Sequence, residues 1–214
     1  METDGLGLRE RKKRATRLAL SAATIQLSVE RGWSNVSVED IAAAADVSVR
    51  TFRNYFASKG EAVAFRQLER MRQVAEALRA RPAKEPLWTA ISAAVAERFP
   101  LGHDMSAESA GQRERHWVAG VRRMLAEPAV RAAILEVNTR AQHELAVAVA
   151  ERTGTDAEHD LYPKLVAAAV GTATAVAIEH GQAANPPLPV LPLLAEALNQ
   201  LATGLPEPAP RRNS

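Results

Sequence analysis

Residues 38–56 constrain the fold more than any other segment, because they contain two short helical patterns separated by a polar corner. In the first pattern, apolar residues recur at helical spacing: Val38, Ile41, Ala42 and Ala45. Asp46-Val47-Ser48 interrupts this stripe before the second pattern begins. Ser37 and Ser48 each precede a pattern, where a serine hydroxyl accepts a free backbone N–H at a helix start. The sequence therefore predicts two short helices, each capped by a serine and joined by a tight turn.

The second predicted helix divides into an apolar side and an outward side. Its apolar anchors are Val47, Phe52 and Phe56. The residues with no core to bury in are Val49, Arg50, Arg53 and Asn54. Arginine and amide side chains on such a face enter a DNA major groove and hydrogen-bond to base edges. The segment therefore indicates a helix-turn-helix unit that binds DNA.

Spaced residues before and after this segment match one known family. The matches are Leu20, Ala23, Leu27 and Gly32 for its first helix, Val38, Ile41 and Ala42 for its second, Val47-Ser48, Thr51-Phe52 and Tyr55-Phe56 for its third, and Ser58-Lys59 for the next helix start. Residues 14–63 resemble the DNA-binding domain of TetR-family transcriptional repressors. The resemblance implies an all-α fold of about nine helices, with a three-helix DNA-binding domain followed by a helical ligand-binding and dimerisation domain.

Three residues depart from the family pattern. Asp46 replaces the usual turn glycine, and aspartate can either cap locally or adopt a left-handed backbone conformation at modest cost. Ser28 replaces a customary phenylalanine on the first helix, and we expect Trp33 to compensate for the lost core contact. Arg53 occupies a site that is often aromatic, so we expect it to alter which base or phosphate is contacted.

The resemblance also implies which residues contact DNA. The base contacts would come from Val49, Arg50 and Arg53, with Arg50 the best suited to bind guanine through its forked donors. The phosphate contacts would come from Thr51, Asn54, Tyr55 and Lys59, joined by Ser37 at a helix start where backbone N–H groups point outward. The whole expected DNA-binding set is Arg14, Ser37, Ser48, Val49, Arg50, Thr51, Arg53, Asn54, Tyr55 and Lys59. For Tyr55, packing in the core is the alternative.

The positive charge of the chain is concentrated at its amino end, although the net charge is only +2. The basic residues there are Arg9, Arg11, Lys12, Lys13, Arg14 and Arg17, against the single acidic residue Glu10. A local basic patch attracts phosphate more effectively than overall charge does. Beside a helix-turn-helix unit we expect this arm to contact DNA, and a solvated tail is the alternative.

Composition narrows the compartment and excludes some chemistry. The chain contains no cysteine, which excludes disulfides and thiolate metal sites and fits a reducing cytoplasm. We expect no uninterrupted apolar run long enough to span a bilayer and no signal peptide. The sequence therefore predicts a soluble cytoplasmic protein with no membrane partner, no cofactor and no metal.

Helical patterns continue along the rest of the chain. Ser58-Lys59-Gly60-Glu61 is a capping box that opens a helix ending near Ala80. Further helices are predicted at 86–99, 112–125, 128–152, 160–180 and 193–201, with connections at 100–111 and 185–192. The predicted domains are a basic arm with the helix-turn-helix at 1–57, a ligand-binding and dimerisation domain at 58–204, and a disordered tail at 205–214.

The second domain is expected to dimerise and to hold a ligand. Residues 160–180 are rich in Ala, Val and Thr, and such small residues let a second helix approach closely. The resemblance implies a homodimer through the last two long helices, here 160–180 and 192–201. Ligand candidates that combine bulk or a polar handle with central placement are Trp88, Phe99, Met105, His116, Trp117, Met124, Asn138 and His143. Ordinary core or surface roles are the alternative for each, and few acids on the apolar faces favour a lipophilic small-molecule effector.

These features together predict a sequence-specific transcriptional repressor that a small molecule releases from a palindromic operator. One alternative is a ligand-independent architectural DNA-binding protein with little sequence preference. Another is a helical enzyme, but the five histidines fall on separate predicted elements and converge on no catalytic set. Glu158-His159-Asp160 could bind a metal, yet three neighbours in a turn point in different directions, and a surface loop explains them better.

Overall fold

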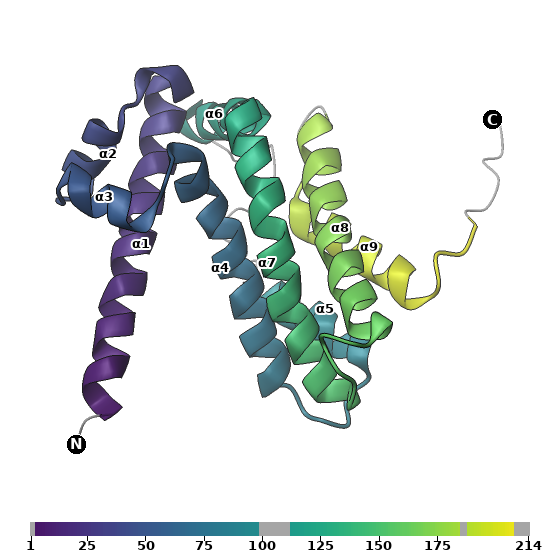
Figure 1. Cartoon of the computed structure of the whole chain (residues 1–214). Coiled ribbons are helices and arrows are strands. Elements are labelled where there is room, and N and C mark those ends of the chain that lie inside the picture. The colour runs from purple at the N-terminus through teal and green to yellow at the C-terminus, as the bar shows by residue number, and fades with distance from the viewer. Residues whose placement is uncertain (1–2, 99–111, 185–187, 208–214) are drawn as a thin grey trace, which may run out of the picture. The chain divides into compact units, whose positions relative to one another are not determined.

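The structure, a computed structural model, describes residues 3–98, 112–184 and 188–207. Across these residues it is helical, with nine α-helices, one short 3-10 helix and no strand (Figure 1). The helices are α1 Thr3–Arg31, η1 Trp33–Asn35, α2 Val38–Ala44, α3 Val49–Tyr55, α4 Lys59–Ala80, α5 Leu87–Arg98, α6 Gln112–Ala126, α7 Pro128–Thr153, α8 Leu161–Ala183 and α9 Val190–Ala202. The predicted all-α fold is confirmed, and the predicted ends of α6 and α7 differ from the observed ones by a single residue.

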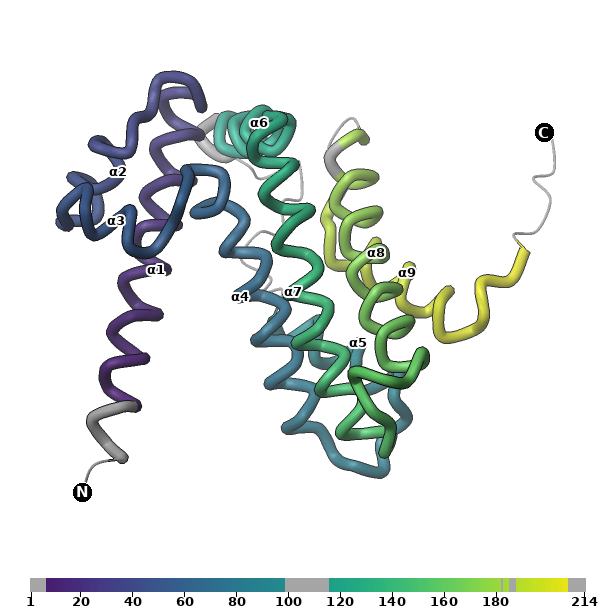
Figure 2. Tube along the Cα trace, viewed as in Figure 1, coloured from purple at the N-terminus to yellow at the C-terminus, as the bar shows by residue number. Residues whose placement is uncertain are grey.

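Backbone contacts divide the described residues into two compact units. The first contains the described residues up to Arg70 together with 112–141, and the second contains Met71 to Arg98 and the described residues from Gln142 onward. α4 and α7 each contribute residues to both units, and the Cα trace in Figure 2 follows both helices without a break. The domain boundaries predicted at 1–57, 58–204 and 205–214 stay a prediction.

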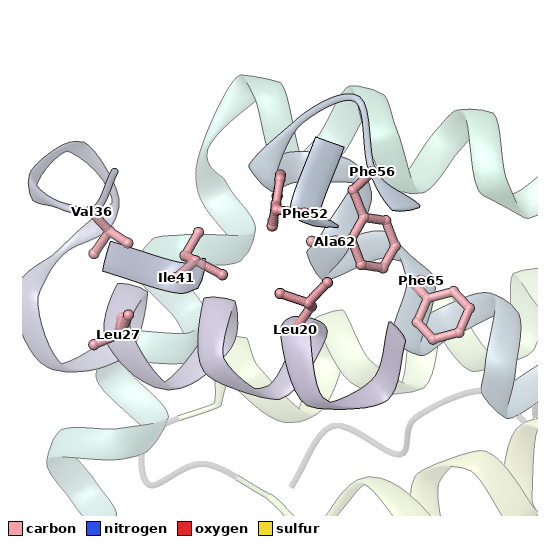
Figure 3. Packing of buried hydrophobic residues seen from close by; sticks show 8 residues of the cluster. All are labelled: Leu20, Leu27, Val36, Ile41, Phe52, Phe56, Ala62 and Phe65. Carbon is pink, nitrogen blue, oxygen red and sulfur yellow. The ribbon is translucent and has the colours of Figure 1, made fainter. Parts of the chain in front are cut away.

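Apolar side chains from the first four α-helices and the connection before α2 form the core of the first unit (Figure 3). Its buried members are Leu20, Leu27, Val36, Ile41, Phe52, Phe56, Ala62 and Phe65. The rings of Phe52 and Phe56 lie 5.8 Å apart, and those of Phe56 and Phe65 lie 5.6 Å apart, both in tilted pairs. Tilted aromatic pairs add about 0.5–1.5 kcal/mol beyond their buried area. This core holds α3 by the apolar side that the sequence predicts.

Local backbone signals set the ends of α1, α2 and α3. Gly32 adopts φ +85° and ends α1, as predicted. Ser37 caps α2 in a reciprocal box with Asp40, and the Ser48 hydroxyl accepts a backbone N–H at 3.0 Å to cap α3. Asp46, in the turn between α2 and α3, adopts φ +54°. Of the two roles expected for this aspartate, a local cap or a left-handed backbone conformation, the structure shows the second.

α6 crosses α1 in close contact within the first unit. A Cβ on Gly120 would lie 2.6 Å from Val29 Cγ1 and 3.0 Å from the Val29 carbonyl oxygen, so only glycine allows this approach. A second buried cluster consists of Val63, Met124 and Val130. Trp33 packs against that cluster and so adds an aromatic side chain to the core. The buried hydroxyl of Ser28, by contrast, has no hydrogen-bond partner among the described residues.

In the second unit, α9 packs against both α8 and α5. The connection between α4 and α5 is held by Arg152 near the end of α7. Its guanidinium donates to three carbonyl oxygens, those of Arg81, Pro82 and Glu85. Because carbonyl groups at the end of a helix lack partners within the helix, this arginine satisfies the end of α4 and the turn that follows.

One predicted boundary among the carboxy-terminal helices is wrong. α9 begins at Val190, three residues before the predicted start, because Pro192 stands in the first turn, where its ring breaks no helical hydrogen bond. In α8, the 21 residues Leu161–Gly181 are long and apolar enough by length and composition to cross a bilayer, and an 18-residue window within them has a mean hydropathy of 1.5. Lys164 and Glu179 interrupt this stretch, so it is not the uninterrupted apolar run that the sequence analysis excludes. Because the core helix of a soluble protein passes the same test, the length is weak evidence for a membrane span.

Candidate nucleic-acid interface

α3 presents two of the three predicted base-contacting side chains, Arg50 and Arg53, on its outer side, whereas Val49 is half-buried. The exposed residues of this helix are Arg50, Arg53 and Asn54. Its half-buried residues are Val49, Thr51 and Tyr55, and the Tyr55 side chain packs against the core of the first unit. Phe52, on the opposite side, is 1% exposed. Two guanidinium groups therefore face solvent from one anchored helix, which is the arrangement that base-edge recognition requires.

Ser37 and Asp40 form reciprocal hydrogen bonds at the start of α2. The Ser37 hydroxyl accepts the Asp40 N–H at 3.0 Å, and Asp40 Oδ2 accepts the Ser37 N–H at 2.8 Å and the Ser37 hydroxyl at 2.5 Å. These hydrogen bonds from Ser37, helped by the charges of Arg31 and Lys59, hold the pKa of Asp40 below its ordinary value. Ser37 is thus committed to the cap while it remains exposed to solvent.

Lys59, the first residue of α4, turns its side chain back onto the segment between α1 and α2. Its Nζ donates to the carbonyl oxygens of Trp33 and Val36, at 2.8 and 2.5 Å, and lies 4.5 Å from the centre of the Trp33 ring. Burial lowers the pKa of Lys59, and the charges of Glu127 and Asp40 oppose that effect. The sequence predicts a phosphate contact for Lys59, whereas its ammonium group is already engaged with backbone carbonyls here.

The basic arm divides into an engaged part and an exposed part. Arg14 forms an ion pair with Glu69 of α4, whose side chain is 4% exposed. The Arg17 guanidinium lies 4.3 Å from the centre of the Phe65 ring and 5.3 Å from that of Phe56. The other basic residues of the arm, Arg9, Arg11, Lys12 and Lys13, are exposed, as is 43% of the Arg14 side chain.

The sequence analysis missed these two inward contacts. Arg14 and Arg17 continue, toward the amino end, the helical spacing of Ser21 and Thr24, which are both fully buried on α1. Extending that periodicity into the basic run would have placed both arginines on the side of α1 that packs within the first unit, although 43% of the Arg14 side chain stays exposed.

Two family profiles and a curated relative match the chain. Residues 20–63 match the profile described as bacterial regulatory proteins, tetR family, and residues 85–206 match the profile of the MftR C-terminal domain. Over 166 residues the chain is 34% identical to the HTH-type transcriptional regulator TcmR of Streptomyces glaucescens, a match that covers 77% of this chain and 72% of TcmR. The chain belongs to the TetR family. This TetR-family protein is a DNA-binding transcriptional regulator and not an enzyme.

Two solved structures are similar to this TetR-family chain across most of its length. The multidrug binding protein EbrR, in a crystal structure with imidazole, is 20% identical, and the match covers 92% of this chain and 93% of EbrR with a TM-score of 0.47. The TetR-family regulator PfmR from Thermus thermophilus is 17% identical, and the match covers 89% of this chain and 100% of PfmR with a TM-score of 0.40. Neither similarity is close enough to assign a binding residue in this chain.

Four of the predicted ligand residues lie in the first unit, and they differ in their exposure to solvent and in their neighbours. His116 on α6 is exposed, and its neighbour Trp117 is half-buried. Met124 belongs to the buried cluster of the first unit described above. Asn138 on α7 lines an open hollow of about 400 Å³. The other residues that line this hollow are Arg131, Ala132, Ile134 and Leu135.

The second unit contains two more of the predicted ligand residues. Trp88 on α5 is half-buried. His143 on α7 is exposed, and its Nδ1 lies 3.7 Å from Glu158 Oε1. The predicted residues Phe99 and Met105 lie outside the described residues, as does the predicted connection at 100–111.

The turn between α7 and α8 uses its carboxylates within the fold. Asp156 Oδ1 accepts the backbone N–H groups of Glu158 and His159, at 2.7 and 2.9 Å, and Asp160 Oδ2 accepts that of Asp156 at 2.7 Å. The hydrogen bonds from His159 and Glu158 hold the pKa of Asp156 below its ordinary value. In the part of the chain that the structure describes, no three metal-binding side chains come together. The hydrogen bonds of this turn favour a surface loop over a metal site.

Proposed function

We propose that this TetR-family regulator is a repressor that binds a near-palindromic operator as a homodimer and leaves it when a small, lipophilic molecule binds. The observation that carries the proposal is the exposed pair Arg50 and Arg53 on a helix whose other side is anchored by Phe52. Recognition of base edges requires donors that are held in fixed positions, and a buried anchor opposite two exposed arginines meets this requirement.

The proposed contacts divide into base recognition and phosphate binding. The base edges are contacted by Val49, Arg50 and Arg53, with Arg50 donating to guanine. The phosphates are contacted by Arg14, Ser37, Ser48, Thr51, Asn54 and Tyr55. Lys59 contributes to DNA binding indirectly, because its ammonium group holds the segment from Trp33 to Val36 in place. The exposed residues of the arm add a sequence-independent attraction that weakens with salt.

The homodimer is proposed to form through α8 and α9. Leu161, Leu165 and Val176 are 70%, 55% and 54% exposed, and their spacing keeps them on one side of α8. An exposed apolar stripe favours a protein partner, and a second copy of the chain matches the two-fold symmetry of a palindrome. Because α9 exposes Glu196 and Gln200, we expect this helix to supply the polar rim. The two recognition helices would then lie about 34–36 Å apart or at a multiple of this distance.

A small-molecule effector is proposed for the helices that follow the DNA-binding unit. The hollow on α7 combines the apolar side chains of Ile134 and Leu135 with polar groups on Arg131 and Asn138. A mostly apolar lining with few polar groups favours a lipophilic ligand. The proposed ligand contacts are Trp88, Phe99, Met105, His116, Trp117, Met124, Asn138 and His143. The effector binds more tightly to a state of the dimer in which the spacing of the two recognition helices does not match the operator. It lowers the DNA affinity by no more than its own difference in affinity between that state and the DNA-binding state.

Sequence selection tests the proposed function. The full chain is mixed with random-sequence duplexes, the bound duplexes are sequenced, and footprinting on DNA beside its own coding region locates the operator. We expect one near-palindromic motif, bound at least about a thousandfold more tightly than unrelated duplex at the same salt concentration. Equal binding to all duplexes would instead identify an architectural protein.

A cytoplasmic location is part of the proposal, because the cysteine-free chain fits a reducing compartment.

A further inference from the structure

Two backbone carbonyl groups between α1 and α2 lie outside the α-helices. They belong to Trp33, the first residue of η1, and Val36, which follows η1. Because α-helical hydrogen bonding does not reach such carbonyl groups, donors must come from elsewhere in the fold. Lys59 Nζ donates to both oxygens, at 2.8 and 2.5 Å, and so bridges them from the start of α4.

The surroundings of Lys59 hold its ammonium group in this place. Nζ lies 4.5 Å from the centre of the Trp33 ring, which is within the range of a cation–π contact. The backbone beside it is fixed as well, because a Cβ on Gly60 would lie 2.8 Å from the Ala129 carbonyl oxygen of α7. The hydroxyl of Ser58 caps the helix by accepting the Glu61 N–H at 3.1 Å. The lysine therefore extends from an anchored helix start.

The bridged segment leads directly into the helix-turn-helix unit. Val36 precedes Ser37, the cap of α2, so a hydrogen bond to the Val36 carbonyl fixes the chain immediately before that cap. Two of the three N–H donors of the ammonium group are used by the carbonyl groups. One N–H donor remains, so a phosphate at this cation would share its charge with both carbonyl groups and with the Trp33 ring.

We propose that Lys59 is a positioning residue, which holds the Trp33–Val36 segment and the start of α2 in place for DNA binding and does not itself neutralise a phosphate. The inference rests on the proposed function, since it concerns how this regulator presents α2 and α3 to DNA. It differs from the phosphate contact that the sequence predicts for this lysine.

The salt dependence of DNA binding distinguishes the two roles. Affinities of the full-length wild type and of Lys59→Met are measured over a range of salt concentrations, with the duplex that the wild type selects from random sequence. A lost phosphate contact reduces the slope of log affinity against log salt by about 0.9. We expect Lys59→Met to bind about tenfold more weakly with an unchanged slope, because the charge-assisted hydrogen bonds to the carbonyl groups are lost. Lys59→Arg should restore affinity, since a guanidinium also donates to two acceptors and stacks on an aromatic ring.

Matched lysine variants calibrate the slope. Lys13→Met removes an exposed charge from the basic arm and should reduce the slope, whereas Lys84→Met removes an exposed charge from the α4–α5 connection and should not. A measurement without DNA uses Trp33 fluorescence in a background with Trp88→Phe and Trp117→Phe, which leaves Trp33 alone among the three tryptophans. We expect Lys59→Met to shift the Trp33 emission and Lys59→Arg to preserve it.

If the wild type selects no motif, the proposed function fails and this inference fails with it. If the wild type selects a motif and Lys59→Met lowers the slope by about 0.9 while Trp33 emission is unchanged, the positioning role is contradicted and the proposed function stands. Should Lys59→Met not fold, Lys59→Gln replaces it in the same comparison, because the amide is uncharged and keeps an N–H donor.

Discussion

Arg14 on α1 and Glu69 on α4 form an ion pair that ties the basic arm to the core of the first unit. The side chain of Glu69 is 4% exposed, whereas that of Arg14 is 43% exposed. A carboxylate withdrawn from water is strongly unfavourable once its partner charge is removed. The arginine at this position therefore supports the fold of the domain that it was predicted to help bind to DNA.

Replacing Arg14 should weaken the fold. We expect Arg14→Ala to lower the free energy of unfolding by about 1–3 kcal/mol, less than for a fully buried pair because the arginine is partly screened by solvent. Chemical denaturation followed by circular dichroism measures the change. Arg11→Ala is the matched control, since Arg11 is exposed on the same helix. Equal stabilities for the two variants would show that the ion pair does not support the fold.

Adding a methyl group at Gly120 should force α6 away from α1. The new Cβ would lie 2.6 Å from Val29 Cγ1 and 3.0 Å from the Val29 carbonyl oxygen, so Gly120→Ala should destabilise the chain by about 1–3 kcal/mol. At Gly7 a Cβ meets nothing within 4 Å, so Gly7→Ala should be neutral or gain up to about 1 kcal/mol. Thermal denaturation compares the two, and an unchanged midpoint for Gly120→Ala would contradict the close crossing.

Asp40 should contribute stability that depends on pH. Hydrogen bonds from Ser37 hold its pKa below the ordinary value of 3.8 in the folded chain. A group with a depressed pKa stabilises the fold above its unfolded pKa and loses this contribution as the pH falls through the folded value. Asp40→Asn should therefore be less stable than the wild type at neutral pH, and the difference should shrink below about pH 4.

Denaturant titrations at a series of pH values measure the Asp40 effect. Glu39→Gln is the control, because Glu39 is the exposed neighbouring acid in the same helical turn. A difference between Asp40→Asn and the wild type that stays constant from neutral to acid pH would contradict the assigned hydrogen bonds.

Charge on the outer side of α8 should break the proposed dimer. Leu165 is 55% exposed on that side, and a carboxylate there would have to be buried against the partner subunit. We expect Leu165→Glu to be a folded monomer in sedimentation velocity and to lose most of its affinity for the palindrome, because its two half-sites are no longer bound together. Leu8→Glu, which changes an exposed leucine on α1, should remain a dimer. Dimeric Leu165→Glu would exclude this face as the interface.

Features that depend on a few consecutive residues could be predicted from the sequence. Ser37, Ser48 and Ser58 lie beside the backbone N–H groups that they cap, Gly32 ends α1 at a positive φ, and Asp46 adopts the left-handed conformation that was one of its two expected roles. These signals are local, since each acts within a single helical turn. The recognition helix and its buried and exposed sides follow from the same local pattern.

Features that depend on how helices cross could not be predicted in this way. Lys59 contacts carbonyl groups more than twenty residues earlier in the chain, and Arg14 pairs with a residue of α4. Neither partner is visible from spacing along one helix, because both contacts arise only once α4 packs against α1 and the connection that follows it. The sequence therefore predicts Lys59 and Arg14 as DNA contacts, whereas the structure shows that each also has a partner within the protein.

The base preference of Arg50→Ala tests the central claim, that the exposed side of α3 recognises DNA sequence. The variant and the wild type are each used to select duplexes at the same salt concentration, and the affinities of both proteins for the wild-type motif are compared. We predict that preference is lost at one base pair in each half-site, with about 1–3 kcal/mol of binding free energy lost and the other positions of the motif retained. A motif that is unchanged at every position, with affinity lowered equally for all duplexes, would contradict the claim.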